Sequence, residues 1–226
     1  MHPTMTRDEI ARKMNTSLLG PAVTRKEMRE FLRACLKYPI KGIALHTSHI
    51  PEALELVEGS ESRIVGIVSY PLFELTPRMV ADWSRATLER GAHELDVGMD
   101  IAAVRSGDYD QAYRSMRAAV DAAEGRTVKA VILCAAMSDD QKLKAVEIAV
   151  RAGAQYVKTN TGYGMVTRVD DVTLIRSRFG DDIKIMVAGG VRDTSGALAM
   201  YEAGASLVAT STPFKVIEGL PGGEAQ

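Results

Sequence analysis

A short phrase recurs three times in this chain, and it limits the possible folds more than any other feature. In each copy a helical pattern ends in a small residue and a glycine, and an apolar strand follows: LERGAHELDV (88–97), VRAGAQYVKT (150–159) and YEAGASLVAT (201–210). Gly91, Gly153 and Gly204 suit the left-handed conformation that commonly ends a helix. The phrase therefore indicates the joint of a repeated strand–helix unit.

The other apolar and amphipathic segments follow the same rhythm. Further strands are expected around Met14–Leu18 and at 40–46, 62–69, 126–134 and 182–189. Helical patterns lie at 24–37, 77–90, 108–124, 138–152 and 193–203. Repeats of roughly 25 to 35 residues with about eight apolar strands predict an α/β fold of the (β/α)8 TIM-barrel type. An open doubly wound sheet is the main alternative, but it usually has fewer strands and a glycine-rich first turn that this sequence lacks.

Length and composition indicate one globular domain. The 226 residues are 46% hydrophobic and 25% charged, enough for a single domain over 1–226, with 221–226 expected as a flexible tail. The 28 basic and 29 acidic residues form no basic block, so nucleic acid is not an expected partner. There is no signal-like apolar start and no apolar run of membrane length. We therefore expect a cytoplasmic protein that does not bind membranes.

The ends of the last two expected strands carry glycines and hydroxyl groups. In a barrel of this type, phosphate commonly binds the loops after strands seven and eight. The seventh strand runs into VAGGVRD, where Gly189 and Gly190 would let backbone amides approach a ligand. The eighth runs into ATSTPF, where Ser211 or Thr212 could cap a helix that begins at Pro213. Each motif alone could be a simple turn or cap, but together they predict a phosphate site.

The sixth expected strand carries a lysine where burial is expected. In QYVKTNTG the alternation of side chains places Tyr156, Lys158 and Asn160 on one face. Lys158 could extend to solvent, or it could point its amine into the barrel mouth. A lysine whose pKa is lowered by burial or by a nearby cation could attack a carbonyl and form an imine. Such chemistry supports cleavage of a carbon–carbon bond without a metal.

The fourth and fifth strands supply charged neighbours for this lysine. In ELDVG, Glu94, Asp96 and Gly98 share one face, so Asp96 could relay a proton to the alcohol at the breaking bond. Lys129, in TVKAVIL, is expected to be buried and to pair with Asp96 or Glu94. Two strands therefore add a candidate proton-transfer group and a second cation.

These segments together resemble the deoxyribose-phosphate aldolase family, over nearly the whole chain. The resemblance rests on ELDVGMDIAAVRSGDYD, VKAVIL, YVKTNTG, AGGVRD and EAGASLVATST. It implies a class I aldolase without metal or other cofactor that cleaves 2-deoxyribose 5-phosphate reversibly to acetaldehyde and glyceraldehyde 3-phosphate. It also implies an imine at Lys158, proton transfer by Asp96, support from Lys129, and phosphate binding by Gly162, Gly189, Gly190, Ser211 and Thr212. A homodimer or larger homo-oligomer is implied as well.

Several positions depart from the family pattern. Members usually have a second lysine three residues before the diglycine, where this chain has Met186, and Lys184 would lie about 6–7 Å deeper. Asn15 replaces an early aspartate, and His46 replaces an asparagine after the second strand; both are expected to face substrate. Two alternatives follow. The chain could use the same imine on a different carbonyl substrate, or it could bind a sugar phosphate without turnover.

The histidines and cysteines do not predict a metal site. His46 and His49 have a spacing that can chelate, but no third ligand is evident, so hydrogen bonding to substrate is the better expectation for His46. Cys35 and Cys134 lack metal-like spacing and are expected to be core residues.

Overall fold

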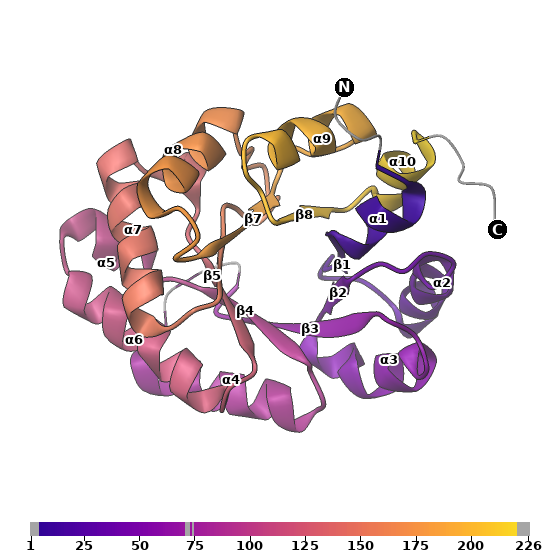
Figure 1. Cartoon of the computed structure of the whole chain (residues 1–226). Helices are drawn as coiled ribbons and strands as arrows, with labels where there is room; N and C mark the ends of the chain where they lie inside the picture. The colour runs from indigo at the N-terminus through magenta and orange to yellow at the C-terminus, as the bar shows by residue number, and fades with distance from the viewer. Residues whose placement is uncertain (1–4, 71–72, 74, 221–226) are drawn as a thin grey trace.

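The structure is a computed structural model that describes residues 5–70, 73 and 75–220. Eight parallel strands close into a barrel in chain order, and β8 pairs with β1 (Figure 1). The strands are β1 (Met14–Leu18), β2 (Gly42–Leu45), β3 (Arg63–Val68), β4 (Glu94–Gly98), β5 (Thr127–Val131), β6 (Tyr156–Lys158), β7 (Lys184–Ala188) and β8 (Leu207–Thr210). The predicted (β/α)8 barrel is confirmed. The predicted tail 221–226 lies outside the described residues.

Helices surround the barrel in Figure 1. They are α1 (Arg7–Arg12), α2 (Arg25–Cys35), α3 (Ile50–Val57), α4 (Pro77–Glu89), α5 (Ile101–Ser106), α6 (Tyr109–Ala122), α7 (Asp139–Ala152), α8 (Val169–Phe179), α9 (Thr194–Glu202) and α10 (Pro213–Glu218), with 3-10 turns η1 (Thr47–His49) and η2 (Cys134–Ala136). All five predicted helical ranges are confirmed within two residues at each end. Each of these helices begins after a Thr, Ser or Asp whose side chain accepts a backbone N–H of the first turn. Helix α8 lies outside the predicted ranges; its N-cap residue is Arg168, which is not a usual capping residue.

The repeated glycine joints have the expected backbone. Gly91, Gly153 and Gly204 have φ values of +100°, +91° and +109°, and each lies between a helix and the strand that follows. At Gly91 a Cβ would also lie 2.2 Å from Leu54 Cδ1. The joints therefore require glycine for backbone conformation, and at Gly91 for packing as well.

Strand β6 ends at Lys158, so Asn160 does not continue its face as expected. Asn160 is buried, and its amide is used elsewhere: Oδ1 accepts from Ala135 N at 3.2 Å and Nδ2 donates to Thr167 Oγ1 at 2.9 Å. These bonds satisfy the buried amide without a strand neighbour. Lys158 is therefore the last residue of its strand, at the mouth of the barrel.

Buried apolar side chains from strands and helices form one large core, and Tyr156, Met186 and Leu207 form a small separate cluster. Cys35 and Cys134 are buried free thiols, as expected. None of the helices in the described ranges combines the length and the apolar character that crossing a membrane requires.

Candidate active site

Four charged side chains from β4, β5 and β6 form a chain inside the barrel. Lys158 Nζ donates a hydrogen bond to Asp96 Oδ2 at 2.6 Å. Asp96 Oδ1 lies 3.3 Å from Lys129 Nζ, which in turn lies 2.5 Å from Glu94 Oε2. Lys129, Asp96 and Lys158 are only 0%, 1% and 3% exposed. The expected burial of Lys129 is confirmed. Its expected pairing is also confirmed, and it pairs with both Glu94 and Asp96.

The register of the strands explains this order. Asp96 lies opposite Lys129 on β5, and Lys129 lies opposite Tyr156 on β6. Lys158 is two residues further along β6, so it stands nearer the carboxyl end of the barrel than Lys129 does. The chain of charges therefore rises along the barrel and ends with the amine of Lys158 at the mouth.

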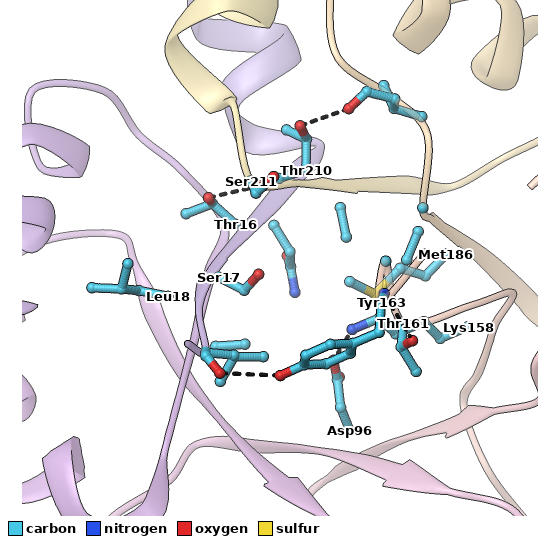
Figure 2. Close-up of a pocket in the computed structure, with 18 of the residues that line it drawn as sticks. Thr16, Ser17, Leu18, Asp96, Lys158, Thr161, Tyr163, Met186, Thr210 and Ser211 are labelled. Atoms are coloured by element: carbon cyan, nitrogen blue, oxygen red, sulfur yellow. Dashed lines mark hydrogen bonds and ion pairs between the residues drawn. The ribbon is translucent and has the colours of Figure 1, made fainter. Parts of the chain in front are cut away.

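The mouth holds a cavity of about 460 Å³, which we call the upper cavity. Lys158, Asp96, Thr161, Tyr163 and Met186 gather on one side of it, and Thr16, Ser17, Thr210 and Ser211 line the side near β1 and β8 (Figure 2). Gly162, Gly189, Gly190 and Asn15 also line it. Lys158 and Asp96 thus meet at the wall of a space large enough for a small sugar phosphate.

Charge at the Lys158–Asp96 pair is set by competing effects. Burial alone disfavours the ammonium, but the Asp96 carboxylate and the Tyr70 phenol outweigh burial and raise the pKa of Lys158 above its ordinary 10.5. Burial likewise disfavours the carboxylate, but Lys158 and Lys129 outweigh it and lower the pKa of Asp96 below its ordinary 3.8. The resting pair is ammonium and carboxylate. The expected lowering of the Lys158 pKa is therefore wrong for this state, because a carboxylate lies 2.6 Å away.

Lys184 does not replace the second lysine that this site lacks. Met186, which is buried, lies opposite Lys158 in the register of β6 and β7. Lys184, at the start of β7, is exposed, and its Nζ lies 5.5 Å from the centroid of the Tyr156 ring. The cation nearest to the pair is instead Lys129, on the other oxygen of Asp96.

A closed ring of hydrogen bonds fixes the end of β6 against β7. Ala188 N donates to Thr159 Oγ1 at 3.1 Å, the hydroxyls of Thr159 and Thr167 are 2.7 Å apart, and Thr167 Oγ1 donates to Ala188 O at 2.6 Å. Thr159 follows Lys158 directly and Ala188 precedes Gly189. The ring therefore fixes the lysine relative to the diglycine loop.

The two adjacent glycines are required by packing as well as by backbone conformation. Gly189 and Gly190 have φ values of +90° and +92°. A Cβ at Gly189 would lie 2.2 Å from Met165 O, and one at Gly190 would lie 2.7 Å from Val166 Cγ1. The loop after β6 thus packs directly on the diglycine. Gly162, in that loop, has a φ of +86°.

Ser211 and Thr212 have different surroundings, although both were expected to bind phosphate. Ser211 lines the upper cavity. Thr212 is not among the lining residues; its hydroxyl donates to Arg192 O at 3.1 Å. Thr212 occupies the N-cap position before Pro213, as expected, but its side chain makes no capping hydrogen bond. Its contacts therefore correct the expectation of a direct ligand contact, because the hydroxyl is used to join the loops after β7 and β8.

Asn15 and His46 also separate. Asn15 is 1% exposed and faces the upper cavity; within 5–70, 73 and 75–220, neither its Oδ1 nor its Nδ2 has a hydrogen-bond partner. His46 does not line the cavity, and its Nε2 lies 3.0 Å from Leu19 O. His46 therefore supports the loop after β1 and does not face substrate as expected, whereas Asn15 presents a free amide to the cavity.

Three further residues of the site were not predicted. The Tyr70 ring, just beyond β3, has its centroid 5.5 Å from Lys158 Nζ. Tyr163 donates from its hydroxyl to Leu19 O at 3.0 Å and so joins the loops after β6 and β1 (Figure 2). Arg192 is exposed and lines the cavity beside the diglycine. The one feature of the sequence that could have indicated these three residues is their position, because each follows the end of a predicted strand.

Among the described residues, no group of three or more His, Cys, Asp or Glu side chains is arranged to hold a metal ion. His49 is buried and lies within η1, close in sequence to His46.

The chain is 35% identical over 216 residues to the deoxyribose-phosphate aldolase of Methanothermobacter thermautotrophicus. The alignment covers 95% of this chain and 96% of that protein. It is 33% identical to the deoxyribose-phosphate aldolase of Dictyoglomus turgidum, over 96% of this chain and 99% of that one. The chain belongs to the deoxyribose-phosphate aldolase family. A deoxyribose phosphate aldolase from Aeropyrum pernix, described as a unique tetramer, superposes with a TM-score of 0.86 at 25% identity, covering 94% of this chain and 91% of that one. No protein-family model matches the chain.

In this aldolase, the residues that depart from the family pattern lie in two different places. Met186 and Asn15 line the upper cavity, where they can affect how a substrate is bound. His46 lies behind the cavity wall on the carbonyl of Leu19. Substrate preference in this member of the deoxyribose-phosphate aldolase family should therefore depend on Met186 and Asn15 more than on His46.

Proposed function

We propose that this aldolase cleaves 2-deoxy-D-ribose 5-phosphate reversibly to acetaldehyde and D-glyceraldehyde 3-phosphate through an imine on Lys158. The observation that carries the proposal is the buried Lys158–Asp96 pair at the wall of the upper cavity, with Nζ and Oδ2 2.6 Å apart. An amine and a carboxylate at this distance supply both a nucleophile and its base.

Imine formation begins when a proton leaves Lys158. Asp96 Oδ2 can accept it directly, because it is already the hydrogen-bond partner of Nζ. The neutral amine attacks the aldehyde carbon, the carbinolamine loses water, and a protonated imine remains. Since burial penalises charge, a substrate that displaces water from the cavity favours the neutral pair.

Cleavage then occurs between C2 and C3 of the sugar. A base removes the proton of the C3 hydroxyl, the C2–C3 bond breaks, and its electron pair moves toward the imine to give an enamine. Glyceraldehyde 3-phosphate leaves, C2 takes up a proton, and water releases acetaldehyde and regenerates the lysine. We assign these proton transfers to Asp96, because its carboxylate lines the cavity beside Lys158.

The phosphate would lie where glycines and hydroxyl groups of the loops after β6, β7 and β8 line the cavity. Gly162, Gly189, Gly190 and Ser211 all line the cavity and are polar or leave backbone amides accessible. Arg192, two residues after Gly190, also lines the cavity and brings a guanidinium group suited to phosphate. Arg192 therefore joins the proposed phosphate ligands, and Thr212 supports them through its bond to Arg192 O.

The direct test is release of glyceraldehyde 3-phosphate from 2-deoxyribose 5-phosphate by the purified protein. Wild type should release it and Lys158→Ala should not. Lys184→Ala is the matched control, since Lys184 is an exposed lysine on the neighbouring strand outside the cavity lining. Full retro-aldol activity in Lys158→Ala would refute the catalytic assignments.

A second candidate keeps the imine but uses a different carbonyl substrate. Two cavity residues favour it: Met186, which places an apolar side chain opposite Lys158, and Asn15, whose amide has no partner among the described residues. A panel of phosphorylated and unphosphorylated aldehydes separates the two. A higher kcat/KM for any of them than for 2-deoxyribose 5-phosphate would favour the second candidate.

The other expected alternative, a barrel that binds a sugar phosphate without turnover, is not favoured, because the chain belongs to an aldolase family. Binding of 2-deoxyribose 5-phosphate by calorimetry, without product and without a reducible adduct, would revive it. We further propose that the chain is a single domain, that it assembles as a homodimer or larger homo-oligomer and that it is cytoplasmic. Sedimentation velocity would test the assembly.

A further inference from the structure

The Tyr163 side chain connects two loops at the mouth of the upper cavity. Its backbone belongs to the loop after β6, and its hydroxyl donates to Leu19 O, in the loop after β1, at 3.0 Å. Figure 2 shows the ring extending from the side of Lys158 toward β1. Tyr163 lines the cavity and is also 49% exposed, so its ring stands between the cavity and solvent. Both ends of this side chain are thus attached.

The carbonyl that accepts from Tyr163 is fixed by a second group. His46 Nε2 lies 3.0 Å from the same Leu19 oxygen and 3.3 Å from Gly20 O. A carbonyl oxygen has two lone pairs, so it can accept from the Tyr163 hydroxyl and from the imidazole at once. Because a carbonyl only accepts, Nε2 carries the proton in this contact. The anchor of Tyr163 is therefore held by a residue that does not line the cavity.

The Tyr163 ring also contacts an aromatic side chain beside the reactive amine. The Tyr70 and Tyr163 centroids are 6.0 Å apart, and the two rings are nearly perpendicular, at 81°. The Tyr70 centroid in turn lies 5.5 Å from Lys158 Nζ. The Tyr70 hydroxyl donates to Thr161 O at 3.4 Å, in the loop that carries Tyr163. The two rings therefore limit the space next to the amine on this side of the cavity.

The loop around Tyr163 leaves the position of the ring to its hydrogen bond. Gly162 and Gly164 have φ values of +86° and +75°, on either side of Tyr163. A Cβ at either glycine would meet no described residue beyond its own neighbours within 4 Å. These glycines thus serve the backbone conformation and are not packed against other segments. Loss of the bond to Leu19 O should therefore let the ring move.

We propose that Tyr163 is a specificity-determining residue, whose ring admits unbranched carbonyl compounds to Lys158 and excludes those that are bulky next to the carbonyl. His46 is then a positioning residue that acts through the Leu19 carbonyl. The inference rests on the proposed function, because it takes Lys158 as the amine that reacts. 2-Deoxyribose 5-phosphate belongs to the admitted class, since its C2, next to the aldehyde carbon, carries only hydrogen besides the carbon chain.

The test is competition between propanal and 2,2-dimethylpropanal for a reduced adduct at Lys158, formed with cyanoborohydride and located by peptide mapping. The second aldehyde has two more methyl groups on the carbon next to the carbonyl. The ratio of the two adducts at Lys158 is divided by the ratio at Lys184, an exposed lysine, in the same sample. This quotient removes the difference in intrinsic reactivity and gives the selectivity for the unbranched aldehyde.

The variants should lower this selectivity in a definite order. Tyr163→Ala should lower it about tenfold or more, because exclusion of even one methylene-sized group by a pocket is worth about tenfold. Tyr163→Phe keeps the ring without its bond to Leu19 O and should lower the selectivity about threefold, as expected for one hydrogen bond. His46→Ala should lower it less. The double variant Tyr163→Phe/His46→Ala should go no further than Tyr163→Phe, because both changes act on one carbonyl.

The matched control is Tyr109→Ala, which removes another exposed tyrosine, on α6 and outside the cavity lining. It should leave the selectivity unchanged. Folding is checked by circular dichroism, and Tyr163→Phe alone decides if Tyr163→Ala does not fold. Unchanged selectivity in the deciding variant would overturn the proposal for Tyr163. Additive effects in the double variant would overturn the role given to His46.

Failure of the proposed function would give a different result. A wild type that forms the propanal adduct at Lys158 but does not cleave 2-deoxyribose 5-phosphate would refute the proposed substrate. The selectivity series would then still decide the inference. A wild type that forms no adduct at Lys158 with either aldehyde would overturn the inference together with the imine.

Discussion

Two buried lysines of this protein have the same burial but different surroundings. Lys158 and Lys142 are each 3% exposed. Lys142, on α7, lies 2.8 Å from both Asp139 and Asp171, so two carboxylates serve one ammonium. Among the described residues, Lys158 has one close carboxylate, Asp96, which it shares with Lys129, and it borders the upper cavity. Burial of a lysine is thus no sign of chemistry by itself; a shared carboxylate beside an open cavity is.

The two lysines also differ in what their removal should cost. In both, burial disfavours the charge and nearby partners outweigh it, so both have a raised pKa. At Lys142 the charge joins α7 to α8 and has no substrate to meet. At Lys158, by contrast, the ammonium must lose a proton before the reaction can occur.

The largest effect should come from removing each of these two lysines in turn. Lys158→Ala should lower kcat/KM by about 10³-fold or more, because no other amine replaces the nucleophile. Lys142→Met should lose about 3 kcal/mol of unfolding free energy, since Asp171 remains buried without the ammonium of Lys142. It should nevertheless retain kcat in the folded fraction. Steady-state kinetics and urea unfolding of both variants check this. Equal losses of activity would remove the distinction between the lysines.

Mutation of the carboxylate beside each lysine should likewise affect activity at Lys158 and stability at Lys142. Asp96→Asn should lower kcat by about 10² to 10⁴-fold, because an amide cannot accept the proton of Lys158. Asp171→Asn, at the other buried lysine, should lower stability but leave kcat within about twofold, since Asp171 does not line the upper cavity. The measurement is kcat at saturating substrate, and an unchanged kcat in Asp96→Asn would contradict the assignment.

A smaller effect is expected at Asn15, whose removal should weaken substrate binding without loss of stability. The removal of Lys142, whose charge is paired, should do the reverse. Asn15→Ala should raise KM by about tenfold, because one hydrogen bond to substrate is lost. It should not lower the unfolding free energy, since the buried amide has no partner within the described ranges. The control is Asn160→Ala, whose amide bonds to Ala135 N and Thr167 Oγ1, and which should be less stable than wild type. A KM unchanged in Asn15→Ala would indicate that Asn15 does not contact substrate.

The smallest effect concerns stability against pH. The folded pKa of Asp96 lies below its ordinary value of 3.8, so the stability that ionised Asp96 contributes is present above pH 3.8 and is lost as the pH falls through the folded pKa. The difference in unfolding free energy between wild type and Asp96→Asn should therefore shrink as the pH falls below 3.8. Urea unfolding at a series of pH values measures it. A constant difference would show that the ionised carboxylate is not what stabilises the site.

The sequence pattern predicted the barrel because local features and the global fold agree. The glycine joints, the capped helices and the apolar strands each specify the same repeated unit, and the strand expected around Met14–Leu18 is β1. Lys158 and Asp96 could be found because a charge within an apolar strand is unusual.

Other parts of the site could not be predicted because they depend on contacts between segments far apart in sequence. Lys142 lies in an ordinary amphipathic helix, and nothing local shows that Asp171 will cover it. The Asn160 amide bonds to Thr167 Oγ1, and the Thr212 hydroxyl bonds to Arg192 O. His46 is not among the residues that line the cavity, and its Nε2 lies on the Leu19 carbonyl.

The most direct test of the imine at Lys158 is mass spectrometry of the protein after incubation with 2-deoxyribose 5-phosphate and borohydride, followed by peptide mapping. We predict one reduced adduct, on the peptide that contains Lys158, and none on the peptide that contains Lys142. An adduct located on another lysine, or no adduct while the folded protein still cleaves the sugar phosphate, would contradict it.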